Sequence, residues 1–301
     1  MAKFERYAKL EILRGSQFSS FSTWKTFNFS SSYDCMNMKF NVEIPYAMKE
    51  SNKANISVCG MTKDNIEELT MFLNLAQNLR KYVRVKLYVG YKDDNDLTLI
   101  FAGDVVNAKP TQPPDVWLEM ECISRFDMKH EIICKYDVED DEKPLKDIYQ
   151  SMAQWMALSL DWKVKGEGNS LKVPNFSYNG SAADIPRYMN KMYPCVESFV
   201  SVDNASLICV DRDSPDVGGD SPTISQDTMM LGVPEPTVAG VKVNTFLWVG
   251  VRKCMKIVLV SDVYPAANGT YIVHGITHSG EIRGGEWKTN LDCKTVVRFA
   301  G

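Results

Sequence analysis

Histidine, cysteine and aspartate are the residue types in this chain whose spacing could support metal or catalytic chemistry. His274 and His278 fall on one face of a predicted strand, from which two imidazole rings could bind a metal ion. His130 and Cys134 stand at i, i+4 spacing and could share a helix face in the same way. Neither pair has further ligands at the spacing that a four-ligand site requires, so we interpret all four as packed or surface residues.

Three aspartates, Asp211, Asp213 and Asp216, offer the oxygen ligands that calcium prefers. The glycine and glutamate positions of a calcium-binding loop are missing around them. Asp213 and Asp216 lie within residues 213–222, which are rich in serine, proline and glycine and are the best candidate for a linker in the chain. A solvated linker is therefore the favoured interpretation.

Enzyme motifs are missing from the sequence. It contains no GxSxG elbow, Walker loop, GxGxxG or HExxH, and only three histidines. Catalytic groups can still meet in space from distant positions, so spacing alone does not exclude an enzyme. We predict a protein that is not an enzyme, with no catalytic, cofactor-binding or metal-binding residues.

Composition favours an ordered protein of about two domains. The chain has 301 residues, is 45% hydrophobic and carries a net charge of −4, which does not favour a phosphate-binding surface. No stretch reaches the ~18–20 apolar residues of a membrane span, and the charged N-terminus shows no signal peptide. The cysteines are scattered singly and are expected to be reduced core thiols that bind no metal; they are Cys35, Cys59, Cys122, Cys134, Cys195, Cys209, Cys254 and Cys293.

Two distant parts of the chain share one pattern of strands. The first comprises residues 85–89, 100–106 and 117–122, and the second comprises residues 257–261, 272–278 and 287–293. The matched positions are Leu87 with Leu259, Gly103 with Gly275, Trp117 with Trp287, and Cys122 with Cys293. The leucine-to-glycine spacing is 16 residues in both copies. A duplicated β unit suggests a pseudo-symmetric building block and not a single catalytic pocket.

Alternation of apolar and polar residues predicts strands at 38–44, 54–58, 82–91 and 97–106, with a stiff loop at 109–114. Between the second and third strands the apolar period becomes helical, and Thr62 can cap that helix. In the middle of the chain, Pro144 suits the first turn of a helix whose apolar stripe runs from Leu145 through Trp155 to Ser159. A second helix at 182–192, a hairpin at 196–211 and an Asn268-Gly269 hairpin turn complete the expectation.

The last third of the chain resembles phage baseplate hub proteins of the tail-tube-like hub, or late control D-like, family. Residues 231–243, LGVPEPTVAGVKV, are similar to the family pattern G-x-P-x-x-T-x-x-G-V-x-V. Residues 269–289, GTYIVHGITHSGEIRGGEWKT, look like the ending G-x-Y-x-V-x-x-x-x-H-x-G-D-x-R-G-x-x-W-x-T, with Glu281 in place of the usual aspartate. Residues before 125 carry the resemblance more loosely, and Cys59-Gly-Met-Thr62 departs from the common N-L-S segment.

The resemblance implies a mainly β fold with α insertions (α+β), in which two tail-tube-like β-barrel domains flank a smaller mixed domain. The expected divisions are a first barrel at 1–125, a peripheral helical and β insertion at 126–221, and a second barrel at 222–301. It also implies a homotrimeric baseplate hub that joins the sixfold tail tube, or its initiator, to a threefold central spike. Such a hub belongs to the virion, is assembled in the host cytoplasm, and forms part of the channel through which DNA passes transiently.

Two other classes stay open at this point. A cell-wall hydrolase domain at a tail tip would need an acid/base pair of carboxylates in a cleft. A generic two-domain binding protein would carry the same strands without assembling into a ring.

Overall fold

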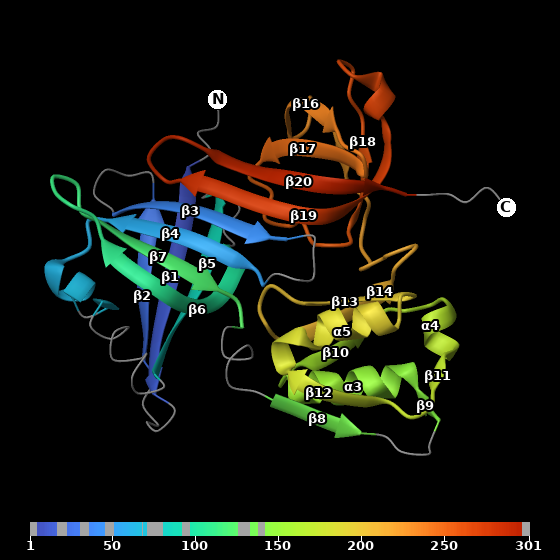
Figure 1. Cartoon of the computed structure of the whole chain (residues 1–301). Coiled ribbons are helices and arrows are strands. Elements are labelled where there is room, and N and C mark those ends of the chain that lie inside the picture. The colour runs from blue at the N-terminus through green and yellow to red at the C-terminus, as the bar shows by residue number, and fades with distance from the viewer. Residues whose placement is uncertain are drawn as a thin grey trace.

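The computed structural model describes residues 5–16, 23–30, 36–45, 51–67, 69–70, 81–91, 97–125, 133–137 and 142–296. Most of its strands form one large twisted sheet, and a smaller part with helices lies beside that sheet (Figure 1). The N-terminal strands of the sheet are β1 Arg6–Ser16, β2 Thr23–Ser30, β3 Asn37–Ile44, β4 Lys53–Cys59, β5 Lys81–Tyr91, β6 Thr98–Pro110 and β7 Trp117–Ile123. Its C-terminal strands are β15 Thr223–Ile224, β16 Met230–Pro236, β17 Gly240–Phe246, β18 Lys256–Leu259, β19 Gly269–Glu281 and β20 Trp287–Thr295.

The sheet contains the same arrangement of five strands twice. Its order is β16-β17-β20-β19-β3-β4-β7-β6-β5-β1-β2, and β18 pairs with both β19 and β15. Strands β3-β4-β7-β6-β5, the first unit, therefore have the same order as β16-β17-β20-β19-β18, the second unit. Leu87 and Leu259 lie on the equivalent strands β5 and β18, and Gly103 and Gly275 lie on β6 and β19.

A shared irregularity aligns the two units residue by residue. Cys122 pairs with Val105, and the register of β6 and β7 shifts directly after that valine. Cys293 pairs with Val273, and the same shift follows in β19 and β20. A bulge inserts one extra residue and bends the strand, so both units turn at the same level.

This alignment shows that two expected equivalences are wrong. Gly103 stands two residues before Val105, whereas Gly275 stands two residues after Val273, so the two glycines are four residues out of register.

Trp117 and Trp287 are not equivalent either. Trp287 stands six residues before Cys293, whereas Trp117 stands five residues before Cys122. Because successive residues of a strand face opposite sides, the two indoles project from opposite faces of their units. Trp287 is buried and Trp117 is only partly buried.

The two units share one sheet through β3 and β19, and no closed barrel is found among the described strands. The order has open ends at β16 and β2, so the expected pair of barrels is replaced by a continuous open sheet. One hydrophobic core runs through both units, with Leu87, Ile56 and Val273 fully buried in it. A strand buried on one face requires such a layer of apolar side chains.

The middle module, residues 133–137 and 142–211, has its own core. Its elements are β8 Ile133–Asp137, β9 Lys143–Pro144, α3 Leu145–Trp155, β10 Ser159–Trp162, α4 Glu167–Ser170, β11 Lys172–Val173, β12 Ser177–Ser181, the 3-10 helix η2 Ala182–Asp184, α5 Ile185–Met192, β13 Val196–Val200 and β14 Ser206–Asp211. The domain boundaries at 125/126 and 221/222 stay a prediction.

Helix α3 buries its expected stripe of Leu145, Ile148, Tyr149 and Met152, because these positions recur at helical spacing. Trp155 is an exception: it was expected on that stripe but is 43% exposed at the end of the helix. Strands β13 and β14 form the expected antiparallel hairpin. No helix in the described part of the chain is both long and apolar enough to cross a membrane.

Three other local predictions, a helix, a loop and a hairpin turn, agree with the structure only in part or not at all. Helical residues 63–67 and 69–70 follow Thr62, whose hydroxyl accepts the Asn65 amide at 3.4 Å, while the rest of that predicted helix lies outside the described residues. Strand β6 continues to Pro110, into the predicted loop. Asn268 and Gly269 do not make a two-residue hairpin turn, because residues 260–268 and the 3-10 helix η3 Pro265–Ala267 connect β18 to β19.

Candidate functional site

The junction of β3 with β19, here called the seam, joins the two ends of the chain. Antiparallel pairing runs from Ile276 opposite Ile44 to Glu281 opposite Lys39. Lys39 Nζ lies 3.4 Å from Glu281 Oε1, and Ser279 Oγ donates to Asn41 Oδ1 at 3.0 Å. The seam therefore combines a backbone ladder with charged and polar side-chain contacts.

Trp287 fills the space behind the seam. Its ring packs edge to face on Phe40, with centroids 5.4 Å apart, and lies 6.3 Å from the ring of Tyr91. A Cβ at Gly280 would come within 2.4 Å of Phe40 Cζ and 2.7 Å of Trp287 Cε3. Only glycine lets β19 approach these two rings so closely.

Arg6 connects the first strand of the chain to the turn after β19. Its Nη1 donates to Glu281 O at 2.6 Å and to Gly284 O at 2.5 Å, and the guanidinium stacks 5.4 Å from the centre of the Trp287 ring. Gly285 has a φ of +56°, a conformation that glycine adopts readily. The G-E-x-R-G-G-E-W motif thus builds the seam and the turn beside it.

His278 and Thr289, two further positions of the resemblance, meet in the core of the second unit. His278 Nδ1 and Thr289 Oγ1 share a hydrogen bond of 2.9 Å, and Thr289 Oγ1 also accepts the Trp248 amide at 2.9 Å. Burial lowers the pKa of His278 to about 4, so the ring is neutral near pH 7. The pair is a buried structural contact.

The other motif, residues 231–243, forms the turn between β16 and β17. The Thr237 amide donates to Gly240 O at 2.8 Å, and the Gly240 amide donates to Thr237 Oγ1 at 3.1 Å. A Cβ at Gly240 would lie 2.2 Å from Cys293 O, so only glycine fits there. Val241 and Val243 then enter the core.

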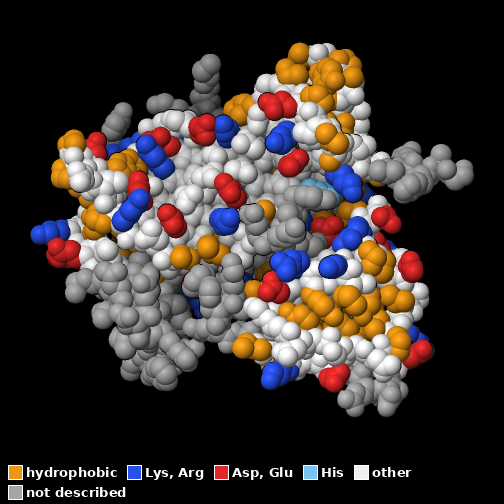
Figure 2. All heavy atoms as spheres, in the orientation of Figure 1, with side chains coloured by type: hydrophobic (Ala, Val, Ile, Leu, Met, Phe, Trp, Pro, Cys, Tyr) orange, Lys and Arg blue, Asp and Glu red, His pale blue; other side chains and the backbone are white. Residues whose placement is uncertain are grey.

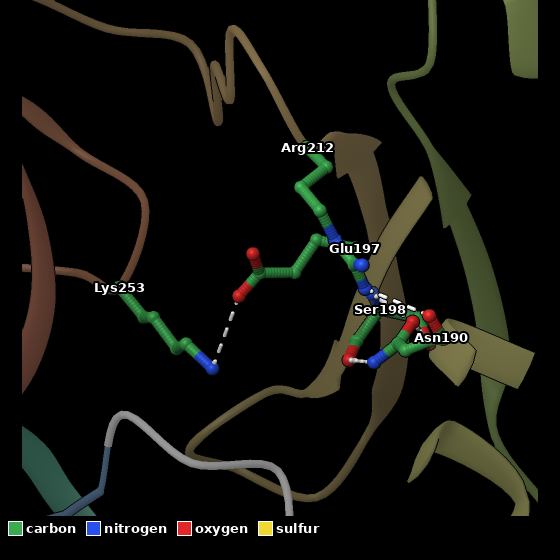
Figure 3. A network of polar contacts seen from close by, with 5 residues as sticks. All are labelled: Asn190, Glu197, Ser198, Arg212 and Lys253. Carbon is green, nitrogen blue, oxygen red and sulfur yellow. Dashed lines mark hydrogen bonds and ion pairs between the residues drawn. The ribbon is translucent and has the colours of Figure 1, made fainter. Parts of the chain in front are cut away.

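A buried ion pair connects the middle module to the second unit. Glu197 on β13 and Lys253, in the segment before β18, face each other with Nζ 3.5 Å from Oε1 (Figure 3). Their side chains are 8% and 7% exposed. His274, the bulge residue of β19, is buried near them; its pKa is lowered, mainly by desolvation, while Glu197 opposes and Lys253 adds to the shift. Removal of Lys253 would leave the Glu197 carboxylate buried without this cation.

Beside this ion pair, Asn190, Ser198 and Arg212 form a network of hydrogen bonds. The Ser198 amide and hydroxyl both donate to Asn190 Oδ1 at 2.8 Å, and Asn190 Nδ2 donates back to Ser198 O at 2.9 Å. Arg212 Nη2 donates to Asn190 O at 2.8 Å (Figure 3). Satisfied buried networks of this kind rigidify the elements that carry them.

A cleft of about 780 Å³ lies where the two units and the middle module meet. Its walls include Lys53 and Ile123 of the first unit, Val251 and Lys253 near the second, and Asp161 of the middle module. Three carboxylates of the described residues line it: Asp161 lies 3.2 Å from Lys163 Nζ, Asp203 accepts the Ser201 hydroxyl at 2.5 Å, and Asp184 lies 4.0 Å from Arg187 Nη1. Residues from three parts of the chain therefore converge on this cleft.

The residues first considered as metal ligands are not brought together. His274 and His278 have the separate environments described above, Cys134 is buried in the core of the middle module, and His130 lies outside the described residues. Asp211 accepts the amides of Lys165 and Gly166 at 2.9 and 3.0 Å, which fixes a loop. Within the described ranges, no group of three or more His, Cys, Asp or Glu side chains could hold a metal ion.

The described cysteines are not joined by disulfides. Burial raises the pKa values of Cys254 and Cys293 to about 12, so both thiols stay protonated at neutral pH. Cys35 lies outside the described residues.

Sequence reasoning missed the seam and the first two strands. In β1, Ala8, Leu10 and Ile12 are buried at every second position, and the same signal is present at Phe27 and Phe29 of β2. These strands could have been found by their period of two. No local signal indicates that β3 pairs with β19.

Several solved structures share this fold. A 43 kDa tail protein of prophage MuSo2 from Shewanella oneidensis superposes with a TM-score of 0.60 at 8% identity, covering 94% of this chain and 96% of that one. A tail protein from Neisseria meningitidis MC58 gives 0.55 at 8% identity, with coverage of 95% and 96%. The E. coli c3393 protein, a type VI secretion component described as similar to the T4 tail proteins gp27 and gp5, gives 0.54 at 10% identity, with coverage of 86% and 73%.

These likenesses define the fold as one found in tail proteins of phages and in a secretion system. No protein of the curated set matches the chain at a significant level. The sequence model of the baseplate hub gp41 family, however, matches residues 25–293, which is most of the chain. The chain belongs to the baseplate hub gp41 family and is a structural component of a phage tail baseplate.

Proposed function

We propose that this protein is the trimeric adaptor of the baseplate, a ring that joins the sixfold tail tube, or its initiator, to a threefold central spike. The observation that carries the proposal is the duplicated five-strand unit within one chain. Three chains with two units each contain six similar units, which match the sixfold tail tube. The same ring has three identical chains, which match the threefold spike, so one ring can bind both neighbours.

The seam supports this arrangement because it is heterologous. A first-unit strand, β3, pairs with a second-unit strand, β19, and the two surfaces that meet are different. Contacts between unlike surfaces propagate in one direction and close into a ring when the rotation per unit allows it. In a ring of six units from three chains, every second contact between neighbouring units is then a seam within one chain.

The surface offers places for further tail components. Figure 2 shows hydrophobic side chains gathered on the projecting tip above β18, where Val260, Val263 and Tyr264 are exposed. Exposed apolar groups that cluster are typical of protein contacts. The net charge of −4 suits a channel wall that repels DNA phosphates and lets DNA slide during ejection.

The test is the number of copies in assembled tails. Mass spectrometry of purified tails with labelled reference peptides should give three copies per tail, and an image of the baseplate should show the two units alternating around a ring. Six copies per tail, or units that do not alternate, would overturn the proposal. Activity of the purified chain on peptidoglycan in a zymogram would instead favour a cell-wall hydrolase.

A further inference from the structure

The alignment of the two units shows which surfaces correspond to the two sides of the seam. Ile276 of β19 pairs with Leu291, two residues before Cys293, and Ala108 of β6 pairs with Met120, two residues before Cys122. Ala108 is therefore the counterpart of Ile276. On the other side, Ala54 pairs with Cys122 and Val241 pairs with Cys293, which makes β16 and the turn after it the counterpart of β3.

The β6 counterpart of the seam is open in the single chain. Strand β6 pairs with β5 only as far as Asp104, and within the described part of the chain no strand covers that side of residues 106–110. Pro110 is exposed, whereas its counterpart His278, which pairs with Val42 of β3, is buried. The side chain of Lys109 is 63% exposed.

The β16 counterpart is open as well. Strand β16 ends the sheet and pairs only with β17. Val238, in the turn, stands at the position of Ile44; Ile44 is buried in the seam, but Val238 is fully exposed. Val238 is thus an exposed apolar residue at a position where its counterpart, Ile44, is covered by the neighbouring unit.

We propose that the β6 edge of one copy receives the β16 edge of a second copy, with Lys109 opposite Thr237 and Ala108 opposite Val238. This contact repeats between chains the packing that the seam makes within one chain, and it rests on the proposed ring of three. Figure 1 shows β6 and β16 on opposite sides of the molecule, so the contact is made between copies.

Charge complements this contact. Lys109 Nζ lies 3.6 Å from Glu119 Oε2 of its own chain, and the two side chains are 63% and 44% exposed. Glu235 is exposed on β16, and in this register it lies diagonal to Lys109 of the other copy, so that the lysine can reach a second carboxylate there. Within the chain, the ion pair of Lys39 with Glu281 crosses the seam in a comparable way.

Prolines weaken the backbone part of the contact. The Thr111 amide donates to Trp117 O and the Thr237 amide donates to Gly240 O, so the backbones of Pro110 and Pro236 face the open edges. Neither proline has an N–H, and together they remove the ladder bonds that residues at these positions could exchange. The contact therefore depends on side chains; it forms in the assembled ring and is too weak to hold free chains together in dilute solution.

Cysteine cross-linking tests the register. One full-length variant carries Lys109→Cys and another carries Thr237→Cys; tails assembled from both are oxidised, and disulfide-linked peptides are mapped by mass spectrometry. Opposite residues of antiparallel strands lie about 4.5–5.5 Å apart, within the reach of a disulfide. The expected result is a link between residues 109 and 237 of different copies, and none when Val263→Cys, an exposed control, replaces Thr237→Cys.

The pair Glu43→Cys and Thr277→Cys, opposite in the seam, is the positive control within one chain. Tails that contain three copies and form the 43–277 link but no 109–237 link would overturn the inference and leave the trimer standing. A copy number other than three would overturn the trimer itself.

Replacing the prolines tests the second half of the proposal. The double variant Pro110→Thr, Pro236→Thr restores two N–H donors at positions that are exposed in the single chain. It should self-associate at concentrations at which the parent chain stays monomeric, and in it the 109–237 link should form without tails. An unchanged monomer mass, measured over a tenfold concentration range, would contradict the role of the prolines.

Discussion

Trp287 and Phe40 stand near opposite ends of the chain, and their rings pack edge to face with centroids 5.4 Å apart. This contact sits directly behind the seam, where β3 of the first unit pairs with β19 of the second. Aromatic pairs in this geometry contribute about 0.5–1.5 kcal/mol beyond their buried area. The two rings therefore help to hold the duplicated units in one continuous sheet.

Replacement of Trp287 by alanine should lower the free energy of unfolding by about 3–5 kcal/mol, because a large buried ring is lost and a cavity remains. Trp117→Ala is the matched control: this indole is only partly buried, and we expect a clearly smaller loss. Denaturant unfolding followed by circular dichroism measures both. Equal losses would show that Trp287 is not a core residue of the seam.

Gly280→Ala should destabilise the protein by about 1–3 kcal/mol, because the added methyl group overlaps the rings of Phe40 and Trp287. Gly269→Ala on the same strand is the control, since its nearest neighbour would lie at 3.6 Å, an ordinary contact. The comparison of the two thermal midpoints checks this. Similar midpoints for both variants would contradict the tight approach at the seam.

Lys253→Met should cost about 3–5 kcal/mol, because the Glu197 carboxylate remains buried without its partner. The double variant Glu197→Leu, Lys253→Met removes both charges and should recover most of the loss. A double-mutant cycle on unfolding free energies gives the coupling. Additive losses would mean that the two residues do not act as a pair.

Stability should fall as the pH is lowered from about 6.5 to 4. The pKa of His278 is about 4 in the folded protein and near 6.5 when unfolded, so the unfolded chain binds the proton first. Above pH 6.5 the neutral His278 ring costs the folded protein nothing. By pH 4 the free energy of unfolding is about 3 kcal/mol lower because of this one residue. His274 acts in the same direction. His278→Gln should show a shallower slope over this range; an unchanged slope would count against the assignment.

Thiol counting in denaturant should find eight free cysteines in freshly purified protein. In the native protein, Cys59, which is partly exposed, should react with iodoacetamide well before Cys293, whose pKa is raised to about 12 by burial. Peptide mapping after timed labelling separates the sites. Fewer than eight thiols, or stoichiometric zinc in metal analysis, would contradict the prediction of reduced, metal-free cysteines.

The local elements and the duplication follow from patterns in the amino-acid sequence. Alternating residues such as Phe40, Val42 and Ile44 specify a strand with one buried face, and the period of two is a local property. The recurrence of strands around Cys122 and Cys293 indicated two similar units, and the residues from 269 to 289 indicated the family.

The way in which the two units join is visible only in the folded chain. The seam pairs residues such as Asn41 and Ser279, which are 238 positions apart, and local pattern carries no information on which edge meets which. The bulges after Val105 and Val273 set the register, and one residue of difference reverses the face of a side chain, as Trp117 and Trp287 show. Which two edges pair, and in which register, depends on both strands together. Neither can therefore be inferred from one segment of the sequence.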